Sequence, residues 1–123
     1  MNKFDLSNMI HIKKNGIEYL KFKILEQYDD KINHIITLRH GGVSKGALSS
    51  LNFRSVGNDS KENNLENLKI VCNTIDFSCN NVYKACQAHT TNILILNDKN
   101  KEKYRFDKFC DEKFDMCLSY TVK

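Results

Sequence analysis

A glycine-rich segment without acids constrains this chain more than any other feature. Four of the five glycines lie between Gly41 and Gly57, and residues 31–58 contain four cations but no Asp or Glu. Glycine lets backbone N–H groups approach a ligand closely, and cations beside small hydroxyl residues suit an anion or a nucleotide sugar. Residues 37–53, TLRHGGVSKGALSSLNF, therefore predict either an anion-binding loop or a surface turn on a basic protein.

Length and composition predict one domain over residues 1–123. The hydrophobic content of 41%, with 7 Phe and 5 Tyr, is enough for a core. The net charge of +4 is mild, and the lysines are spread along the chain near acids. This pattern does not predict a nucleic-acid-binding surface.

Cysteine usage and the N-terminus indicate the compartment. The 5 cysteines form no Cys-x-x-Cys pair, and an odd number fits poorly with a disulfide framework, so we expect reduced thiols. The first residues contain no apolar signal region, and no apolar window is long enough to span a bilayer. We expect a cytoplasmic protein without a membrane partner.

The N-terminal part predicts a β-hairpin. Asn15-Gly16 separates two short apolar segments, residues 9–12 and 17–25, and this dipeptide is the strongest short-range hairpin signal. Three apolar residues of the second segment alternate with lysines and are expected to face the core: Leu20, Phe22 and Ile24. A further strand is predicted over residues 34–38.

A helix is predicted after the glycine-rich segment. Asp59 is the expected N-cap, with Glu62 able to reciprocate in a capping box. Apolar residues recur at helical spacing and predict one buried face: Leu65, Leu68, Cys72 and Ile75. Cys72 is expected to be a core residue and not a reactive thiol.

The C-terminal part predicts mostly extended structure. Residues 82–89 are a short extended segment, residues 93–96 a buried strand and residues 114–122 another strand, while residues 99–113 predict a surface loop or short helix anchored by Phe106 and Phe109. The fold class is thus α+β, with a mixed β-sheet, an N-terminal β-hairpin and at least one packed helix.

The titratable residues give no complete local site. Among the 4 histidines, no two have metal-site spacing, and no Ser-His-Asp arrangement, P-loop or dinucleotide motif occurs. His89 stands where an extended segment ends, between Gln87 and Thr90, so it is either a site residue or an ordinary surface group. Cys86 and His89 point to opposite faces of an extended segment and do not form a thiol and imidazole pair.

Several short motifs, in order and spacing, resemble the N-terminal half of the laccase-domain family. They are Arg39-His40-Gly41-Gly42-Val43-Ser44, Ser50-Leu51-Asn52, Gly57-Asn58, Glu66-Asn67 and Gln87-Ala88-His89. R-x-G-G-V-S followed by S-L-N is fairly specific, whereas Q-x-H alone is weak. The similarity runs from the Asn15-Gly16 hairpin through Phe114-Asp115. Two substitutions depart from the family pattern, Leu38 for Thr and Thr90 for Gly.

The resemblance implies a cytoplasmic purine nucleoside phosphorylase. Its substrates would be phosphate and adenosine, inosine or methylthioadenosine, often with adenosine deaminase activity. Arg39 and Asn52 would be catalytic, and the substrate-binding residues would be Arg39, Gly41, Gly42, Ser44 and Gln87. The metal would be zinc, not the copper of the family's older name, multicopper polyphenol oxidase, with His89 as a ligand.

The resemblance also implies an incomplete site. Family members take two further zinc ligands from A-D-C and H-A-G-W-R-G motifs, neither of which this sequence contains. Because a catalytic zinc normally has three protein ligands, we expect a truncated or split member with a partial site, whose partner is the missing C-terminal segment. Whether Cys110 or Cys117 acts as a substitute zinc ligand is left open by the sequence. The alternative function is a non-catalytic remnant or split subunit that binds a partner or an anionic ligand without turnover.

Overall fold

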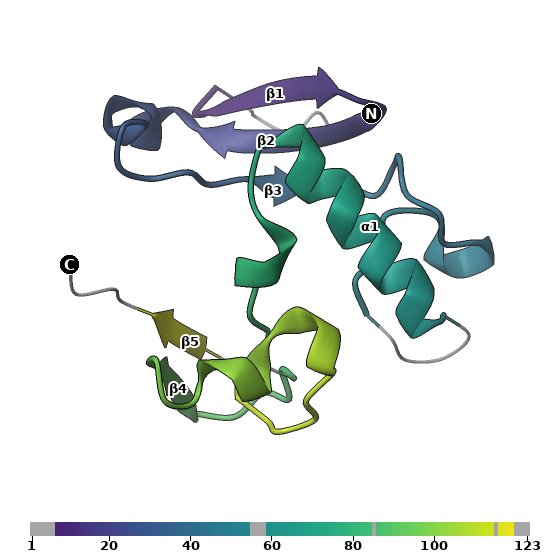
Figure 1. Ribbon diagram of the computed structural model, residues 1–123. Coiled ribbons are helices and arrows are strands. Elements are labelled where there is room, and N and C mark those ends of the chain that lie inside the picture. The colour runs from purple at the N-terminus through teal and green to yellow at the C-terminus, as the bar shows by residue number, and fades with distance from the viewer. Residues whose placement is uncertain (1–6, 55–58, 85, 115, 120–123) are drawn as a thin grey trace. The chain divides into compact units, whose positions relative to one another are not determined.

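The computed structural model describes residues 7–54, 59–84, 86–114 and 116–119, with side chains through residue 114. The chain forms two compact units, Met1–Asp76 and Phe77–Lys123, each of which is described by itself (Figure 1). The secondary structure confirms the α+β class, with an N-terminal hairpin and a packed helix. A single domain over the whole chain stays a prediction.

The first unit contains a three-stranded antiparallel sheet in the order β1-β2-β3. Its strands are β1 (Met9–Lys14), β2 (Ile17–Phe22) and β3 (Ile36–Thr37). Asn15 and Gly16 connect β1 to β2 with φ values of 52° and 79°. A two-residue turn with both φ values positive matches the twist of a hairpin, so the hairpin prediction is confirmed.

The predicted inner face of β2 is wrong. Ile17 and Tyr19 are 0% and 7% exposed, whereas Phe22 and Ile24 are 39% and 71% exposed. The prediction assumed that the lysines of β2 point into solvent. The half-buried Lys21 instead lies on the same face of β2 as Tyr19, and its amino group forms an ion pair with Glu26 at 2.8 Å. Since side chains alternate along a strand, an error of one residue exchanges the two faces. β2 also ends at Phe22, where the 3-10 helix η1 (Lys23–Tyr28) begins.

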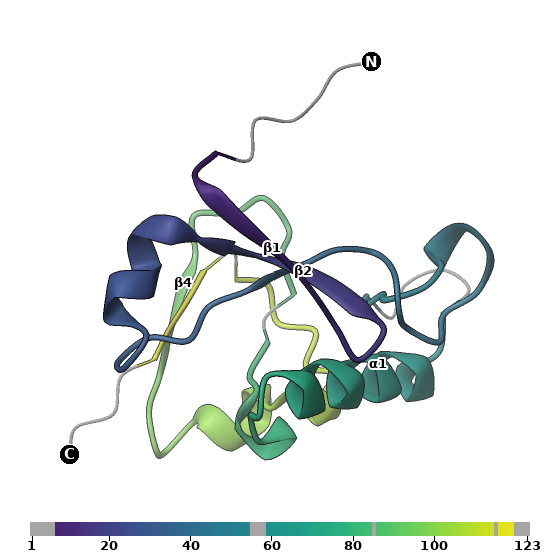
Figure 2. The same ribbon diagram turned by 90° about the horizontal axis from the view of Figure 1, so that it is seen from above.

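Helix α1 (Lys61–Thr74) packs against β2 (Figure 2). The residues that join them form the core of this unit: Ile17, Tyr19, Leu51 and Val71. The buried face of the helix consists of Asn64, Asn67, Leu68, Val71, Cys72 and Thr74. Cys72 is 2% exposed, which confirms it as a core residue. No helix within the described part of the chain is long and apolar enough to cross a membrane.

The predicted N-cap of α1 is wrong by one residue. Ser60 is the N-cap, and its hydroxyl oxygen accepts a hydrogen bond from Asn63 N at 3.1 Å. Either an Asp or a Ser can cap a helix, and both precede this one. Asp59 does not cap α1 because its carboxylate serves as an acceptor for several side chains, as shown below.

The second unit contains a parallel pair of strands, β4 (Ile93–Leu96) and β5 (Met116–Ser119). The strand predicted over residues 93–96 is confirmed as β4, but its predicted burial is wrong for one face: Leu94 and Leu96 are buried, whereas Ile93 and Ile95 are each 54% exposed. The strand predicted over residues 114–122 is confirmed over β5, and residues 115 and 120–122 lie outside the described residues.

Two bridges and three short 3-10 helices complete this unit. The segment predicted as extended, residues 82–89, pairs through Tyr83 with Arg105 and through Cys86 with Lys113. The short helices are η3 (Cys79–Asn81), η4 (Lys101–Tyr104) and η5 (Phe106–Lys108). The last two lie in the segment predicted as a surface loop or short helix. Phe106 is buried, as expected for an anchor of this segment, and so is Tyr104, which was not predicted.

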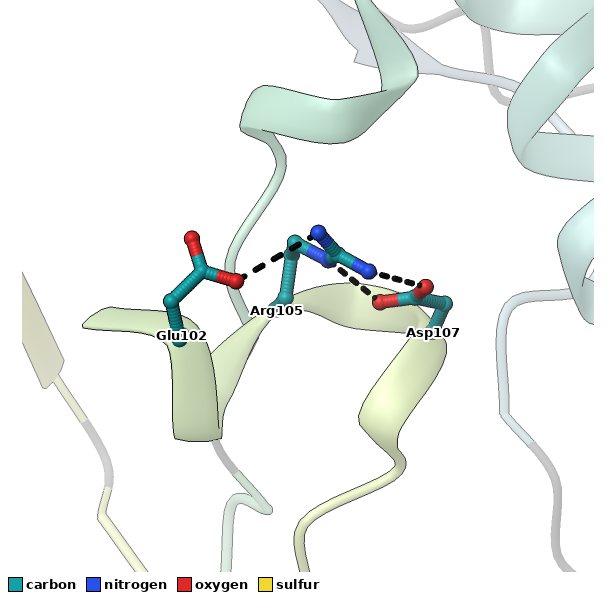
Figure 3. A network of polar contacts seen from close by, with 3 residues as sticks. All are labelled: Glu102, Arg105 and Asp107. Carbon is teal, nitrogen blue, oxygen red and sulfur yellow. Dashed lines mark hydrogen bonds and ion pairs between the residues drawn. The ribbon is translucent and has the colours of Figure 1, made fainter. Parts of the chain in front are cut away.

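Arg105 fixes the corner between η4 and η5 (Figure 3). Its Nε and Nη2 donate to the two carboxylate oxygens of Asp107 at 2.8 Å each, and Nη1 donates to Glu102 at 3.4 Å. A bidentate pair of this kind holds the guanidinium plane in one orientation. Its neighbours in the sequence, Tyr104 and Phe106, are both buried.

The corrected face of β2 predicts the effect of two matched substitutions. Ile17→Ala should lower the free energy of unfolding by about 2–5 kcal/mol, because it empties a buried site. Ile24→Ala removes the same atoms from an exposed position and should change it by no more than about 0.5 kcal/mol. Urea unfolding followed by circular dichroism measures both values, and a larger loss for Ile24→Ala would contradict the assigned face.

Candidate functional site

The segment predicted to bind an anion forms a loop beside α1. Residues 39–52, called the Arg39 loop below, follow β3 and contain the 3-10 helix η2 (Gly46–Leu48). They lie next to the N-terminal half of α1 in both views (Figures 1 and 2). Ser50 N and Leu51 N donate to Arg39 O at 2.9 and 2.8 Å, and Ser44 N donates to Ser50 O at 3.0 Å. These bonds close the loop on itself.

The carboxylate of Asp59 is the centre of a polar network that joins this loop to the start of α1. Five groups donate to its two oxygens: Asn52 Nδ2 (2.5 Å), Ser44 Oγ (2.8 Å) and Asn64 Nδ2 (3.1 Å) to Oδ2, and Ser60 N (2.9 Å) and Asn63 Nδ2 (2.9 Å) to Oδ1. A carboxylate is well suited to this position because it accepts at both oxygens and donates nothing.

This network lowers the pKa of Asp59 from its ordinary value of 3.8 to about 2. The hydrogen bond from Asn52 is the largest cause and that from Asn63 the next, while partial burial acts in the opposite direction. Donors favour the ionised form of a carboxyl, so Asp59 is an anion at neutral pH.

Asn67 makes a second connection between α1 and the loop, one helical turn after Asn63. Its side chain is 0% exposed. Its Oδ1 accepts from Val43 N at 2.8 Å, and its Nδ2 donates to Ser44 Oγ at 3.0 Å and to Asn52 O at 2.6 Å. A buried amide with its hydrogen bonds made in this way specifies one arrangement of the chain around it.

Gly41 and Gly42 pack closely against their surroundings. Gly41 has a φ of 98°, and a Cβ there would meet the carbonyl of Gly16 and lie 2.7 Å from Ile17 Cγ2. A Cβ on Gly42 would meet the carbonyl of Ser50 and lie 2.5 Å from the Asn67 Oδ1. Contacts this short leave no room for a side chain, so the packing of the loop by itself requires glycine at both positions.

Arg39 is one of two exposed cations of this loop, with Lys45, and its charged group is held against loop carbonyls by hydrogen bonds. Its Nε donates to Ser49 O at 3.0 Å and its Nη2 to Ala47 O at 3.5 Å. Within the part of the chain that the structure describes, Arg39 forms no ion pair with a carboxylate. The loop carbonyls thus orient the guanidinium while Nη1 stays available to an anion.

The remaining predicted site residues divide into two groups. Ser44 is 1% exposed, and both its hydroxyl and the amide of Asn52 are engaged within the network. Gln87 and His89 belong to the second unit and are exposed. His89 has a φ of 56°, a left-handed conformation that is uncommon outside glycine.

The donors for a zinc ion are not complete among the described residues. A catalytic zinc takes three protein ligands, and no group of three or more His, Cys, Asp or Glu side chains that could hold a metal occurs there. His89 as a single imidazole does not fit such an ion. Cys117, considered above as a substitute ligand, is a residue whose side chain the structure does not describe.

A shallow polar hollow of about 240 Å³ lies elsewhere in the first unit. It is lined by Lys14, Tyr19, Lys21, Asn33, Ile35, Thr74, Ile75 and Asp76. None of the predicted site residues lines it. The candidate site is therefore the Arg39 loop with its support on α1, and not this hollow.

Comparison with protein families agrees with the motifs of the Arg39 loop. Residues 33–122 match the model of the multi-copper polyphenol oxidoreductase laccase family. The match includes the loop, α1 and the segment around His89. This chain therefore belongs to that family, which includes purine nucleoside phosphorylase-like proteins. No curated protein matches the chain.

Sequence reasoning missed the polar support of the loop. Asp59 was interpreted as a helix cap, and the buried amides Asn64 and Asn67 were left out of the inner face of α1. A signal was present, because the two asparagines lie at helical spacing next to Leu68 and Val71 on the same face. Asparagines on the apolar face of a helix, with an acidic residue nearby in the sequence, indicate a buried polar network.

The lowered pKa of Asp59 predicts how stability depends on pH. A carboxyl whose pKa is lower in the folded state stabilises the fold above its ordinary pKa, and this contribution is lost as the pH falls toward the folded value. Asp59→Asn should therefore be less stable than the wild type at neutral pH, and the difference should shrink between about pH 4 and pH 2.

Urea unfolding at neutral pH and at about pH 3 measures this difference. Asp30→Asn, which removes an exposed carboxylate of the same unit, is the control. A difference between wild type and Asp59→Asn that is equal at both pH values would contradict the ionised network.

Proposed function

We propose that this chain supplies the phosphate-binding part of a purine nucleoside phosphorylase that acts on adenosine, inosine or methylthioadenosine, with adenosine deamination as an accompanying activity. One observation carries the proposal: the exposed guanidinium of Arg39 is held by two loop carbonyls and has no carboxylate partner among the described residues. Membership of a family that includes purine nucleoside phosphorylase-like proteins supports this choice of anion.

Phosphorolysis needs what this loop can provide. A phosphate oxygen forms a bond to C1′ of the sugar, the glycosidic bond breaks, and its electron pair leaves with the purine, which takes up a proton. Phosphate must be held close to C1′ while its charge is balanced. A guanidinium provides charge-assisted hydrogen bonds to two phosphate oxygens in one plane, so we assign the binding and orientation of phosphate to Arg39.

Other residues of the loop have narrower roles in this proposal. Both amide hydrogens of Asn52 are engaged, one with Asp59 and one with Arg54 O at 2.8 Å. Its Oδ1 is thus the atom that would accept a hydrogen bond from a substrate hydroxyl. Gln87 would contact the purine, and the N–H of Gly41 would assist Arg39.

The zinc part of the proposal needs residues from outside the described set. His89 is the one ligand that the family resemblance assigns here, and the described residues do not complete the site. We propose that a segment with the A-D-C and H-A-G-W-R-G motifs supplies the others, as a partner of this chain. We derive no step of the reaction through the metal.

The incomplete donor set also favours a second candidate function, in which the chain binds an anionic ligand or a partner without turnover. Arg39 would then bind phosphate in the same way, since its position in the loop does not depend on a metal. The two functions differ in their products. Free purine forms only in the first, so chromatography of inosine incubated with phosphate and the completed protein separates them.

The role of Arg39 predicts the effect of its removal. Arg39→Ala should weaken the binding of inorganic phosphate by roughly ten- to hundred-fold, because hydrogen bonds to charged groups contribute about 1.5–3 kcal/mol. Isothermal titration of the folded chain measures the affinity. Arg54→Ala is the matched control, since it removes an exposed arginine from the same acid-free segment. Equal affinities of wild type and Arg39→Ala would refute the assignment.

The role of His89 predicts a zinc stoichiometry. The chain by itself should bind far less than one zinc per molecule, and the chain with a segment carrying both missing motifs should bind about one. His89→Ala should abolish that gain, whereas His11→Ala, which removes an exposed imidazole bonded to Glu18 at 2.9 Å, should not. Elemental analysis after dialysis measures the metal. Full zinc binding by His89→Ala would count against this ligand.

A further inference from the structure

Asp59 joins two separate parts of the Arg39 loop. Ser44 and Asn52 donate to the same carboxylate oxygen at 2.8 and 2.5 Å. Asn67 repeats this connection from the next turn of α1, since its Nδ2 donates to Ser44 Oγ at 3.0 Å and to Asn52 O at 2.6 Å. The middle of the loop, at Ser44, and its C-terminal end, at Asn52, are therefore both fixed to the start of one helix.

These contacts continue to Arg39 through the backbone. Ser44 N donates to Ser50 O at 3.0 Å, and Ser50 N donates to Arg39 O at 2.9 Å. The side chain of Arg39 then donates from Nε to Ser49 O at 3.0 Å. A shift of Ser44 would thus move the carbonyls that orient the guanidinium.

Neither Asp59 nor Asn67 is placed to meet an anion itself. Asp59 is negatively charged, and both its oxygens are occupied by donors. Asn67 is 0% exposed. Their chemistry is that of support: an ionised acceptor for many donors, and a buried amide that both accepts and donates.

We propose that Asp59 and Asn67 are positioning residues that hold the Arg39 loop in its phosphate-receiving conformation through their hydrogen bonds to Ser44 and Asn52. This inference rests on the proposed function for the identity of the ligand. It adds that phosphate affinity depends on side chains that do not touch phosphate.

Asp59→Asn and Asn67→Ala test the proposal. The first places an amide NH₂ group against side-chain donors, and the second removes the acceptor of Val43 N and the donor to Asn52 O. Thr74→Ala is the matched control, because Thr74 is a buried polar residue on the same face of α1 whose hydroxyl bonds to Ile70 O within the helix.

The first readout is the binding of inorganic phosphate to the folded variants by titration calorimetry. Asp59→Asn and Asn67→Ala should each weaken it by roughly ten-fold, an effect in the range that side chains acting through packed networks produce. Thr74→Ala should bind like the wild type even if it unfolds more easily. Wild-type affinity in both loop variants would overturn the proposal, as would an equal loss in Thr74→Ala.

The second readout needs no ligand. Hydrogen exchange of Leu51 N–H, which donates to Arg39 O, and the NMR signal of Arg39 Nε–H report the closure of the loop at atoms that neither substitution alters. The chain has three arginines, Arg39, Arg54 and Arg105, so Arg39→Lys identifies this signal.

Exchange at Leu51 should accelerate and the Arg39 signal should shift in both loop variants, but not in Thr74→Ala. Unchanged values would overturn the positioning role. If the wild type bound no phosphate, the proposed function would fail, while the second readout would still decide whether Asp59 and Asn67 hold the loop.

Discussion

The conformation of the Arg39 loop depends on the hydrogen bonds to one carboxylate. Asp59 accepts from the loop side chains Ser44 and Asn52 and from the start of α1, so an irregular segment with several glycines takes one conformation. Hydrophobic burial alone would not fix such a loop, since Leu51 is its one fully buried apolar residue among those described. Asn67 supplies the buried second connection. The loop is thus specified by polar contacts, and the sheet and helix beneath it by apolar packing.

What the sequence predicts well is local. The Asn15-Gly16 turn, the presence of a helix after the glycine-rich segment and the burial of Cys72 follow from patterns of a few residues, and the structure confirms them. The buried face of β2 was predicted wrongly. In the sequence, a lysine such as Lys21, whose stem lies on the inner face of the strand, cannot be distinguished from a lysine that points into solvent. The helical spacing of Asn67 beside Leu68 and Val71 was a local signal of its burial, but its partner Ser44 lies 23 residues away, and no local pattern connects the two.

The candidate site could be predicted in part, because some of its residues lie close together in the sequence. Arg39, Gly42, Ser44 and Asn52 come from one short segment, and the structure brings them together in one loop. The sequence did not show that Arg39 is available to a ligand, whereas the hydroxyl of Ser44 and the amide of Asn52 are already hydrogen-bonded to Asp59. Gln87 and His89 lie in the second unit. In the proposed function, the first unit binds phosphate and the second contributes one ligand to a metal site that another segment completes.

The most direct test of this account is an NMR titration of the chain with inorganic phosphate. The account predicts that the Arg39 Nε–H signal and the backbone amides of residues 39–52 shift together and saturate, with smaller shifts for the amides at the start of α1. Signals around the exposed cations outside this loop should stay in place. Saturating shifts centred on the hollow near Lys14 and Lys21, or no saturating shift at Arg39, would contradict the claim that this loop receives phosphate.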